Sequence, residues 1–284
     1  MDHIVEFKKQ HTHLICLDSD GCAIDGMTVK HLECFGPCAI EEWKLEENQK
    51  ELLEYWNKIN LYTLSRGINR FKGLSLLLKY AKEKEYITDD LDVYENWVTT
   101  TKELSNVSLE SEIEKIEDNV LIKALSWSKK VNVAVAGLPN DKKLAFQGVK
   151  ETLKAAQQYA DIAVISAANA RAVDEEWDFN ELSEHVDVCM TQEYGSKAEC
   201  IRQLLEKGGY TPSNVIMIGD ALGDYQSSAE ANHILFYPIL VGKEGDSWRR
   251  FKEELLDRFI QNQYSDELMQ ELFLEFRKNL GGEN

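Results

Sequence analysis

The stretch His13-Leu14-Ile15-Cys16-Leu17-Asp18-Ser19-Asp20-Gly21 decides the fold of this chain. Its apolar residues run without interruption into an Asp-x-Asp-Gly turn, which predicts a short strand buried on both faces, as in a parallel sheet. In open α/β sheets, ligands bind beyond the carboxyl ends of the strands, so Asp18 and Asp20 stand where chemistry is expected. Asp and Gly are also ordinary turn residues, so this stretch alone leaves a plain acidic turn open.

The composition limits the class of protein and its partners. The chain has 284 residues, 43% of them apolar and 29% charged, with a formal net charge of −18. These values indicate a globular protein with one large domain or two ordinary ones. The acidic charge argues against nucleic acid or an anionic membrane as a partner, because either would need a basic face. A small anionic substrate stays open if a metal ion or a few lysines and arginines meet its charge.

The remaining composition favours a cytoplasmic protein. The N-terminal residues lack the basic segment and apolar core of a signal peptide, and no apolar run reaches the length of about 18 residues needed for a membrane span. The six cysteines are spread through the sequence, which favours reduced, buried thiols. Cys34 and Cys38 have the spacing of half a metal site, but no second Cys or His pair completes it, so zinc is not expected there.

Residues 24–143 show helical periodicity almost throughout, which predicts an all-α insertion. The expected helices cover 41–60, 70–83, 90–104, 109–117 and 119–130, and 131–136 is expected to continue the last of them. The segment Arg66-Gly-Ile-Asn69-Arg70-Phe-Lys72 is a local cationic cluster in this acidic protein. These side chains are either solvated charges or contacts for a second anionic group on a substrate.

Strands and helices alternate from residue 144 onward, which predicts right-handed βαβ units and a parallel sheet. Strands are expected at 162–165, 186–190, 215–218 and 234–241, and helices at 148–159, 197–207 and 224–231. Two further helices follow residue 247, and the apolar face of the second packs on the core or, alternatively, forms a dimer contact. We therefore expect a doubly wound α/β core formed by 1–23 and 144–284, with the all-α domain 24–143 inserted.

Polar side chains stand where these strands end. Asp18, Ser166 and Asp220 end three strands, and Lys197 opens a helix after a fourth. Because parallel strands end at one edge of the sheet, these groups are expected to meet in space. Carboxylates suit Mg²⁺, which prefers hard oxygen ligands and keeps several waters. An ammonium and a hydroxyl can hold phosphoryl oxygens, and a carboxylate can act as the nucleophile that forms an aspartyl-phosphate.

On these motifs the chain resembles phosphatases of the haloacid dehalogenase (HAD) superfamily that carry a helical, C1-type cap after the first motif. Residues 14–21 resemble the first motif, 162–166 the second, Lys197 the third and 219–224 the fourth. The resemblance covers 16–21 and about 146–232 and implies a Rossmann-like core. Cys22 departs from the family, which more often has Thr or Val there; that position supports the loop.

The resemblance implies a role for each acidic residue. Asp18 would attack phosphorus and become the aspartyl-phosphate, and Asp20 would protonate the leaving oxygen and later deprotonate water. The Asp18 carboxylate, the Asp20 backbone carbonyl and Asp220 would hold Mg²⁺. Asp224 would complete that shell through a water or orient Lys197.

Ser166 and Lys197 would, by the same resemblance, bind the phosphoryl oxygens. An ammonium at a helix start opposes the helix dipole, which favours a functional role for Lys197. The implied protein is a cytoplasmic, Mg²⁺-dependent phosphatase of a small phosphorylated metabolite, as a monomer or homodimer. Asp20 argues against the dehalogenase branch, which generally lacks this acid. Two alternatives stay open: a phosphomutase of the β-phosphoglucomutase type, and a non-catalytic binding protein that accepts a phosphoryl group.

Overall fold

The computed structural model describes residues 4–282, and the chain divides into two compact units. The first, here called the core unit, comprises Met1–Met27 and Asn140–Asn284, and the second, the cap unit, comprises Thr28–Pro139. The cap unit is therefore an insertion between the first strand of the core unit and the rest of it. The boundaries lie four residues from the expected 23/24 and 143/144.

The core unit contains one parallel sheet with the strand order β3-β2-β1-β4-β5. The strands are β1 (His13–Leu17), β2 (Ala160–Ile165), β3 (Val188–Met190), β4 (Val215–Gly219) and β5 (Leu235–Pro238). β1 is central: its residue Ile15 pairs with Ile162 of β2 and Ile216 of β4. Every residue of β1 is buried, as expected for an uninterrupted apolar strand covered on both faces.

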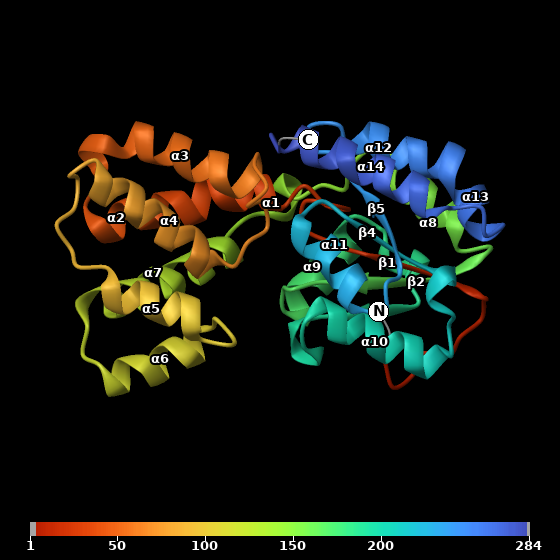
Figure 1. The fold of residues 1–284 in the computed structure, drawn as a ribbon, viewed down its shortest axis with the longest axis horizontal. Coiled ribbons are helices and arrows are strands. Elements are labelled where there is room, and N and C mark those ends of the chain that lie inside the picture. Colours follow the sequence, from red (N-terminus) through yellow and green to blue (C-terminus); the bar gives the residue numbers. More distant parts are fainter. Residues whose placement is uncertain (1–3, 283–284) are drawn as a thin grey trace. The chain divides into compact units, whose positions relative to one another are not determined.

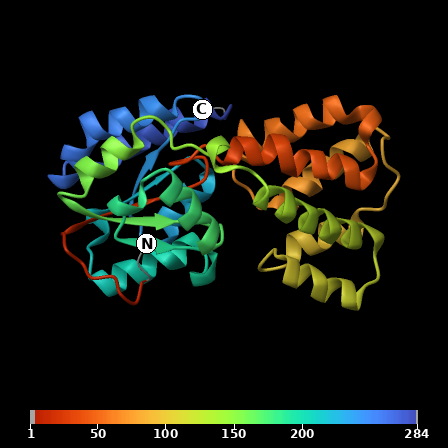
Figure 2. The same cartoon turned by 180° about the vertical axis from the view of Figure 1, so that it is seen from behind.

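Helices cover both faces of this sheet, which makes the core doubly wound. Ile15 and Leu17 of β1 face one apolar layer, whereas Leu14 and Cys16 face the other. Figures 1 and 2 show α10 on the opposite side of the sheet from α8, α12 and α13. The helices of the core unit are α8 (Val149–Ala156), α9 (Ala170–Phe179), α10 (Lys197–Gly208), α11 (Leu222–Glu230), α12 (Glu244–Arg250), α13 (Leu256–Ile260) and α14 (Asp266–Asn279).

The sequence pattern did not predict two features of these helices. The first is α9, the helix that follows β2. α12 and α13 are joined by a π-helical segment, η7 (Phe251–Leu255). In α14, Leu272 and Phe276 are buried and the helix lies against β5, so its apolar face packs on the core.

The cap unit is all α, as predicted. Its helices are α1 (Met27–Lys30), which begins in the last residue of the core unit, the π-helical η1 (His31–Phe35), α2 (Gly36–Trp43), α3 (Gln49–Leu61), α4 (Arg70–Glu83), α5 (Asp92–Thr100), α6 (Asn106–Lys115) and α7 (Asn119–Ala136). The expectation of one helix over 41–60 is wrong, because α2 ends at Lys44 in the left-handed conformation. The continuation of the last helix through 131–136 is confirmed.

Candidate active site

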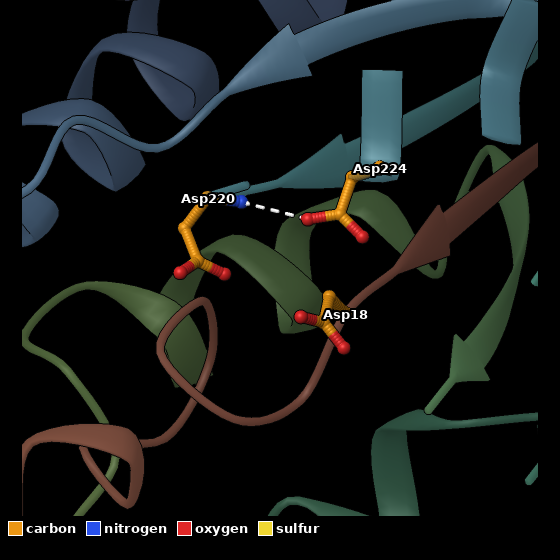
Figure 3. A group of neighbouring side chains, drawn as sticks. All are labelled: Asp18, Asp220 and Asp224. Carbon is orange, nitrogen blue, oxygen red and sulfur yellow. Dashed lines mark hydrogen bonds between the residues drawn. The ribbon is translucent and has the colours of Figure 1, made fainter. Parts of the chain in front are cut away.

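Three aspartates lie together where neighbouring strands end. Asp18 follows β1, Asp220 follows β4, and Asp224 lies in the first turn of α11. One carboxylate oxygen from each lies within 4.8 Å of the other two, and all three residues are buried (Figure 3). The wide sequence separation between Asp18 and the other two is closed by the pairing of β1 with β4.

The turn after β1 is organised around Ser19. Its amide donates to Oδ1 of Asp18 at 2.8 Å, and its carbonyl accepts from the amides of Ala23 at 3.0 Å and Ile24 at 2.9 Å. Gly21 has a φ of 91°, a left-handed conformation that glycine adopts without a Cβ penalty. The loop therefore turns back at once and leaves Asp18 at the edge of the sheet.

Lys197 connects the nucleophile candidate Asp18 to Asp224 of the fourth motif. It is the first residue of α10, and its Nζ lies 2.8 Å from Oδ1 of Asp18 and 2.6 Å from Oδ1 of Asp224. The other oxygen of Asp224 accepts from the backbone amides of Asp220 and Ala221, both at 3.1 Å. Asp224 thus holds both the ammonium and the backbone of the turn after β4, as Figure 3 shows for the Asp220 amide.

Gly219 is required by this close approach. A Cβ added at Gly219 would lie 2.3 Å from the Cβ of Asp224, so any larger residue at this position would displace the Asp224 side chain. The Gly-Asp pair that ends β4 is therefore explained by packing as well as by chemistry.

The electrostatics of the site favour a cation. The pKa of Asp18 is raised to about 8: burial is the largest cause, the carboxylates of Asp224 and Asp220 also raise it, and Lys197 lowers it. Burial alone would lower the pKa of Lys197, but the carboxylates of Asp18 and Asp224 raise it above its usual value. Three buried carboxylates lie together while one ammonium contacts two of them, and the hard carboxylate oxygens fit a divalent ion such as Mg²⁺, which would also keep Asp18 ionised.

Ser166 and Asp20 lie in the segments that follow β2 and β1. Ser166 is buried, its amide donates to the carbonyl of Met190, and its Oγ accepts from the amide of Ala168 at 3.2 Å. β2 is the neighbour of β1, so Ser166 is on the same edge as Asp18. Asp20 is half-buried and forms an isolated bridge with Ile24.

Two members of the cationic cluster have structural partners in the cap unit. Arg66 is buried, and its Nη1 donates to the carbonyl of Leu61 at 2.9 Å. Asn69 caps α4, where its Oδ1 accepts from the amide of Phe71 at 2.9 Å. Each of these contacts is made within the helical unit itself.

The other two members differ from each other. Nη1 of Arg70 donates to Oδ1 of Asn132 at 2.6 Å, and its guanidinium lies 5.1 Å from the ring centre of Phe35. Lys72 is exposed. A contact between this cluster and a substrate stays a prediction.

Two tryptophans that support the turn were not among the predicted site residues. Nε1 of Trp177, in α9, donates to Oγ of Ser19 at 2.8 Å, and Nε1 of Trp248, in α12, donates to the carbonyl of Cys22 at 2.9 Å. Both indoles are fully buried. A buried Trp usually finds an acceptor, but a single sequence does not say which one.

Beyond this edge, the part of the chain that the structure describes has no second cluster of metal-binding side chains, and its six cysteines are free. Between residues 4 and 282, the longest apolar helices fall short of what a membrane crossing requires.

The comparisons with known proteins concern both family and fold. The family model of haloacid dehalogenase-like hydrolases matches residues 86–236, more than half of the chain. This region includes Ser166, Lys197, Asp220 and Asp224, whereas Asp18 precedes it. No curated protein matches the sequence.

Solved structures resemble the chain at low identity. A protein of Lactobacillus delbrueckii subsp. bulgaricus, provisionally named a phosphoglycolate phosphatase, is 12% identical with a TM-score of 0.52, and the alignment covers 87% of this chain and 99% of that one. A haloacid dehalogenase-like family hydrolase of Streptococcus pneumoniae is 13% identical (TM-score 0.45, coverage 84% and 90%). A defluorinating L-2-haloacid dehalogenase is 11% identical (TM-score 0.42, coverage 82% and 82%).

At these identities, the Lactobacillus structure supports the fold alone. The family match spans the larger part of the chain and contains three of the four motifs found in the sequence. The chain belongs to the haloacid dehalogenase-like hydrolases.

Proposed function

We propose that this hydrolase cleaves a small phosphate monoester in a Mg²⁺-dependent reaction, through an aspartyl-phosphate on Asp18. The observation that carries the proposal is the position of the Lys197 ammonium, which contacts both Asp18 and Asp224 while three buried carboxylates lie within 4.8 Å of one another. A carboxylate nucleophile, a fixed cation and a place for a divalent ion are the parts that phosphoryl transfer needs.

The metal would be held by the carboxylates of Asp18 and Asp220 and the backbone carbonyl of Asp20, with Asp224 nearby. When bound, Mg²⁺ neutralises charge on the phosphoryl oxygens and reduces their repulsion of the Asp18 carboxylate. The remaining chemistry belongs to the side chains of the chain.

In the first half-reaction, Asp18 attacks phosphorus in line with the ester oxygen. The Ser19 amide and the Lys197 ammonium both donate to Oδ1 of Asp18, which orients the carboxylate and leaves Oδ2 as the proposed attacking oxygen. The bond from phosphorus to Oδ2 forms as the bond to the ester oxygen breaks. Asp20 gives its proton to that oxygen, and the alcohol leaves.

In the second half-reaction, the Asp20 carboxylate takes a proton from water as the water oxygen attacks phosphorus. The bond between phosphorus and Oδ2 breaks, inorganic phosphate leaves, and Asp18 returns as a carboxylate. Ser166 and Lys197 are proposed to hold the phosphoryl oxygens, where negative charge develops during both steps.

Selection of the ester is assigned to the cap unit. We propose that the cap unit, Thr28–Pro139, acts as a lid that excludes water and contacts the leaving group, with Arg66, Asn69, Arg70 and Lys72 as candidate contacts. The name of the Lactobacillus structure, which has a TM-score of 0.52, agrees with a small phosphorylated acid as one substrate class to test.

The test is the release of inorganic phosphate from a panel of phosphorylated metabolites, with Mg²⁺ and with excess EDTA. Turnover of an ester by the wild-type protein, its loss with EDTA and its loss in Asp18→Asn are expected. A 2-haloacid should release no halide under the same conditions. Halide release without phosphatase activity would contradict the proposal, and a requirement for a sugar bisphosphate would favour a mutase.

A further inference from the structure

The amide, carbonyl and hydroxyl oxygen of Ser19 each form hydrogen bonds that hold the turn carrying the nucleophile candidate. Its amide donates to Oδ1 of Asp18 at 2.8 Å, its carbonyl accepts from two amides of the turn, and its Oγ accepts from Nε1 of Trp177 at 2.8 Å. Ser19 is 1% exposed and Trp177 is fully buried, so water does not compete for the bond between them. The orientation of the Asp18 carboxylate therefore depends on a residue that is anchored from α9.

The bond to Ser19 is more than a consequence of burying an indole. Trp97 of the cap unit is 2% exposed, and its Nε1 has no hydrogen-bond partner among the residues that the structure describes. This chain thus tolerates a buried indole without an acceptor, although a buried N–H that lacks one carries a desolvation cost. The acceptor at Trp177 needs an explanation of its own.

The same helix also anchors the chain segment that returns to the core unit. Glu176 forms a buried ion pair with Lys143 at 3.1 Å. The side chain of Asn180 accepts from the amide of Ala145 at 2.7 Å and donates to the carbonyl of Lys143 at 2.9 Å. This returning segment pairs with the outgoing one, since the amide of Asp25 donates to the carbonyl of Leu144 at 2.8 Å. One short helix therefore holds the nucleophile turn and the chain segment that leads back from the insertion.

We propose that Trp177 is a positioning residue: its bond to Ser19 fixes the Ser19 amide on Asp18 and so aligns the nucleophile, while Glu176 and Asn180 tie the returning segment to the same helix. This inference rests on the proposed function, because alignment is measured as turnover. The bond acts on the orientation of Asp18 and not on the groups proposed to hold phosphoryl oxygens. Its loss should lower kcat and leave KM nearly unchanged.

The experiment is a double-mutant cycle with Trp177→Phe, Ser19→Ala and the combined variant, assayed with p-nitrophenyl phosphate and Mg²⁺. Each single variant should lower kcat by about tenfold, because a small misplacement of a reacting group has a large effect on rate. KM should change by less than about twofold, as expected for an interaction that acts on the reacting geometry. The kcat of the combined variant should be no lower than that of the less active single variant, because all three variants lack the same hydrogen bond.

Two controls separate this effect from damage to the fold. Trp97→Phe makes the same ring change without removing a hydrogen bond, and it should keep kcat. Ser19→Ala removes one oxygen without opening a large cavity, so it tests the inference even if Trp177→Phe folds poorly. In nitrogen–proton correlation spectra, the indole signal that Trp177→Phe deletes should shift in Ser19→Ala.

The outcomes distinguish the two proposals. Wild-type protein that turns over no phosphate ester would overturn the proposed function and this inference with it. A wild-type protein that is active, with Ser19→Ala equally active or with effects that multiply in the combined variant, would overturn the positioning role alone. An indole signal that does not respond to Ser19→Ala would also contradict it.

Discussion

The edge of the sheet that carries Asp18, Asp220 and Asp224, here called the core edge, and the cationic cluster of the cap unit both contain several charged side chains. The two regions differ in how those charges are compensated. At the core edge, three carboxylates are buried within 4.8 Å of one another with one ammonium between two of them. In the cap unit, Arg66 and Arg70 donate to neutral oxygens of their own unit and Lys72 is exposed. Like charges that are buried together cost stability, which makes these carboxylates candidates for a functional site. Arg66 and Arg70 have hydrogen-bond acceptors in their own unit, so a structural role is enough to account for their positions.

The largest expected effect concerns the nucleophile. Asp18→Asn keeps the size and hydrogen-bonding shape of the side chain but removes the attacking carboxylate, so kcat should fall by more than about 1000-fold. The fold should survive, because the change relieves crowding among the carboxylates. Phosphate release and circular dichroism measure the two properties. Residual turnover close to that of the wild type would place the nucleophile elsewhere.

Removing the Lys197 ammonium tests whether it offsets the repulsion between the buried carboxylates of the core edge. Lys197→Met leaves Asp18 and Asp224 without their shared cation, and the free energy of unfolding in EDTA should fall by about 3 kcal/mol. The matched variant Lys72→Met, at an exposed position of the cap unit, should stay within about 0.5 kcal/mol of the wild type. Urea denaturation gives both values. Equal effects at the two lysines would remove the distinction between the regions.

A divalent cation should stabilise the folded protein by binding at the core edge, and not through the cationic cluster of the cap unit. Mg²⁺ at about 100 times its dissociation constant should stabilise the protein by about 2.7 kcal/mol, because it binds the folded state. Asp220→Asn removes one proposed ligand and should abolish most of this gain, whereas Arg70→Ala should keep it. Thermal unfolding with Mg²⁺ and with EDTA provides the comparison. An unchanged response in Asp220→Asn would contradict the ligand set.

In the cap unit, the effect of losing a charge should be structural. Arg70→Ala removes the bond to Asn132 and the contact with Phe35, so the free energy of unfolding should fall by about 1–2 kcal/mol. Arg171, an exposed residue of α9 paired with Glu175, offers the control Arg171→Ala, with almost no expected loss. If Arg70→Ala also raises KM for the best substrate more than for p-nitrophenyl phosphate, the cluster contacts substrate as well.

The smallest effect lies at the opposite end of β1. Burial lowers the pKa of His13, with a hydrogen bond to Asn262 opposing it. The unfolded chain therefore binds the proton more readily, so this group reduces stability as the pH falls below about 6.5, with a slope of at most about 1.4 kcal/mol per pH unit. His13→Gln should flatten the pH dependence of unfolding between pH 7 and 5. An unchanged slope would show that the ring is not a source of it.

Much of the site could be predicted from sequence because its candidate residues lie in short motifs at the ends of predicted strands. Uninterrupted apolar runs predicted the strands, and the rule that parallel strands share an edge placed Asp18, Lys197 and Asp220 near one another. The break at Lys44 escaped prediction, because periodicity continues across a non-glycine residue in the left-handed conformation. α9 escaped it because few apolar residues mark its buried face.

The sequence by itself determined the class of fold, the insertion and the identity of the acidic and basic groups at the sheet edge, since these depend on local pattern and on the geometry of parallel strands. Only the tertiary structure decided which carboxylate shares the Lys197 ammonium, that Gly219 must make room for Asp224, and that Trp177 donates to Ser19. The physical reason is that a strand or helix is set by neighbours in the chain, whereas these contacts are set by how separate elements pack, as between α9 and the turn after β1, which lie 158 residues apart in the sequence.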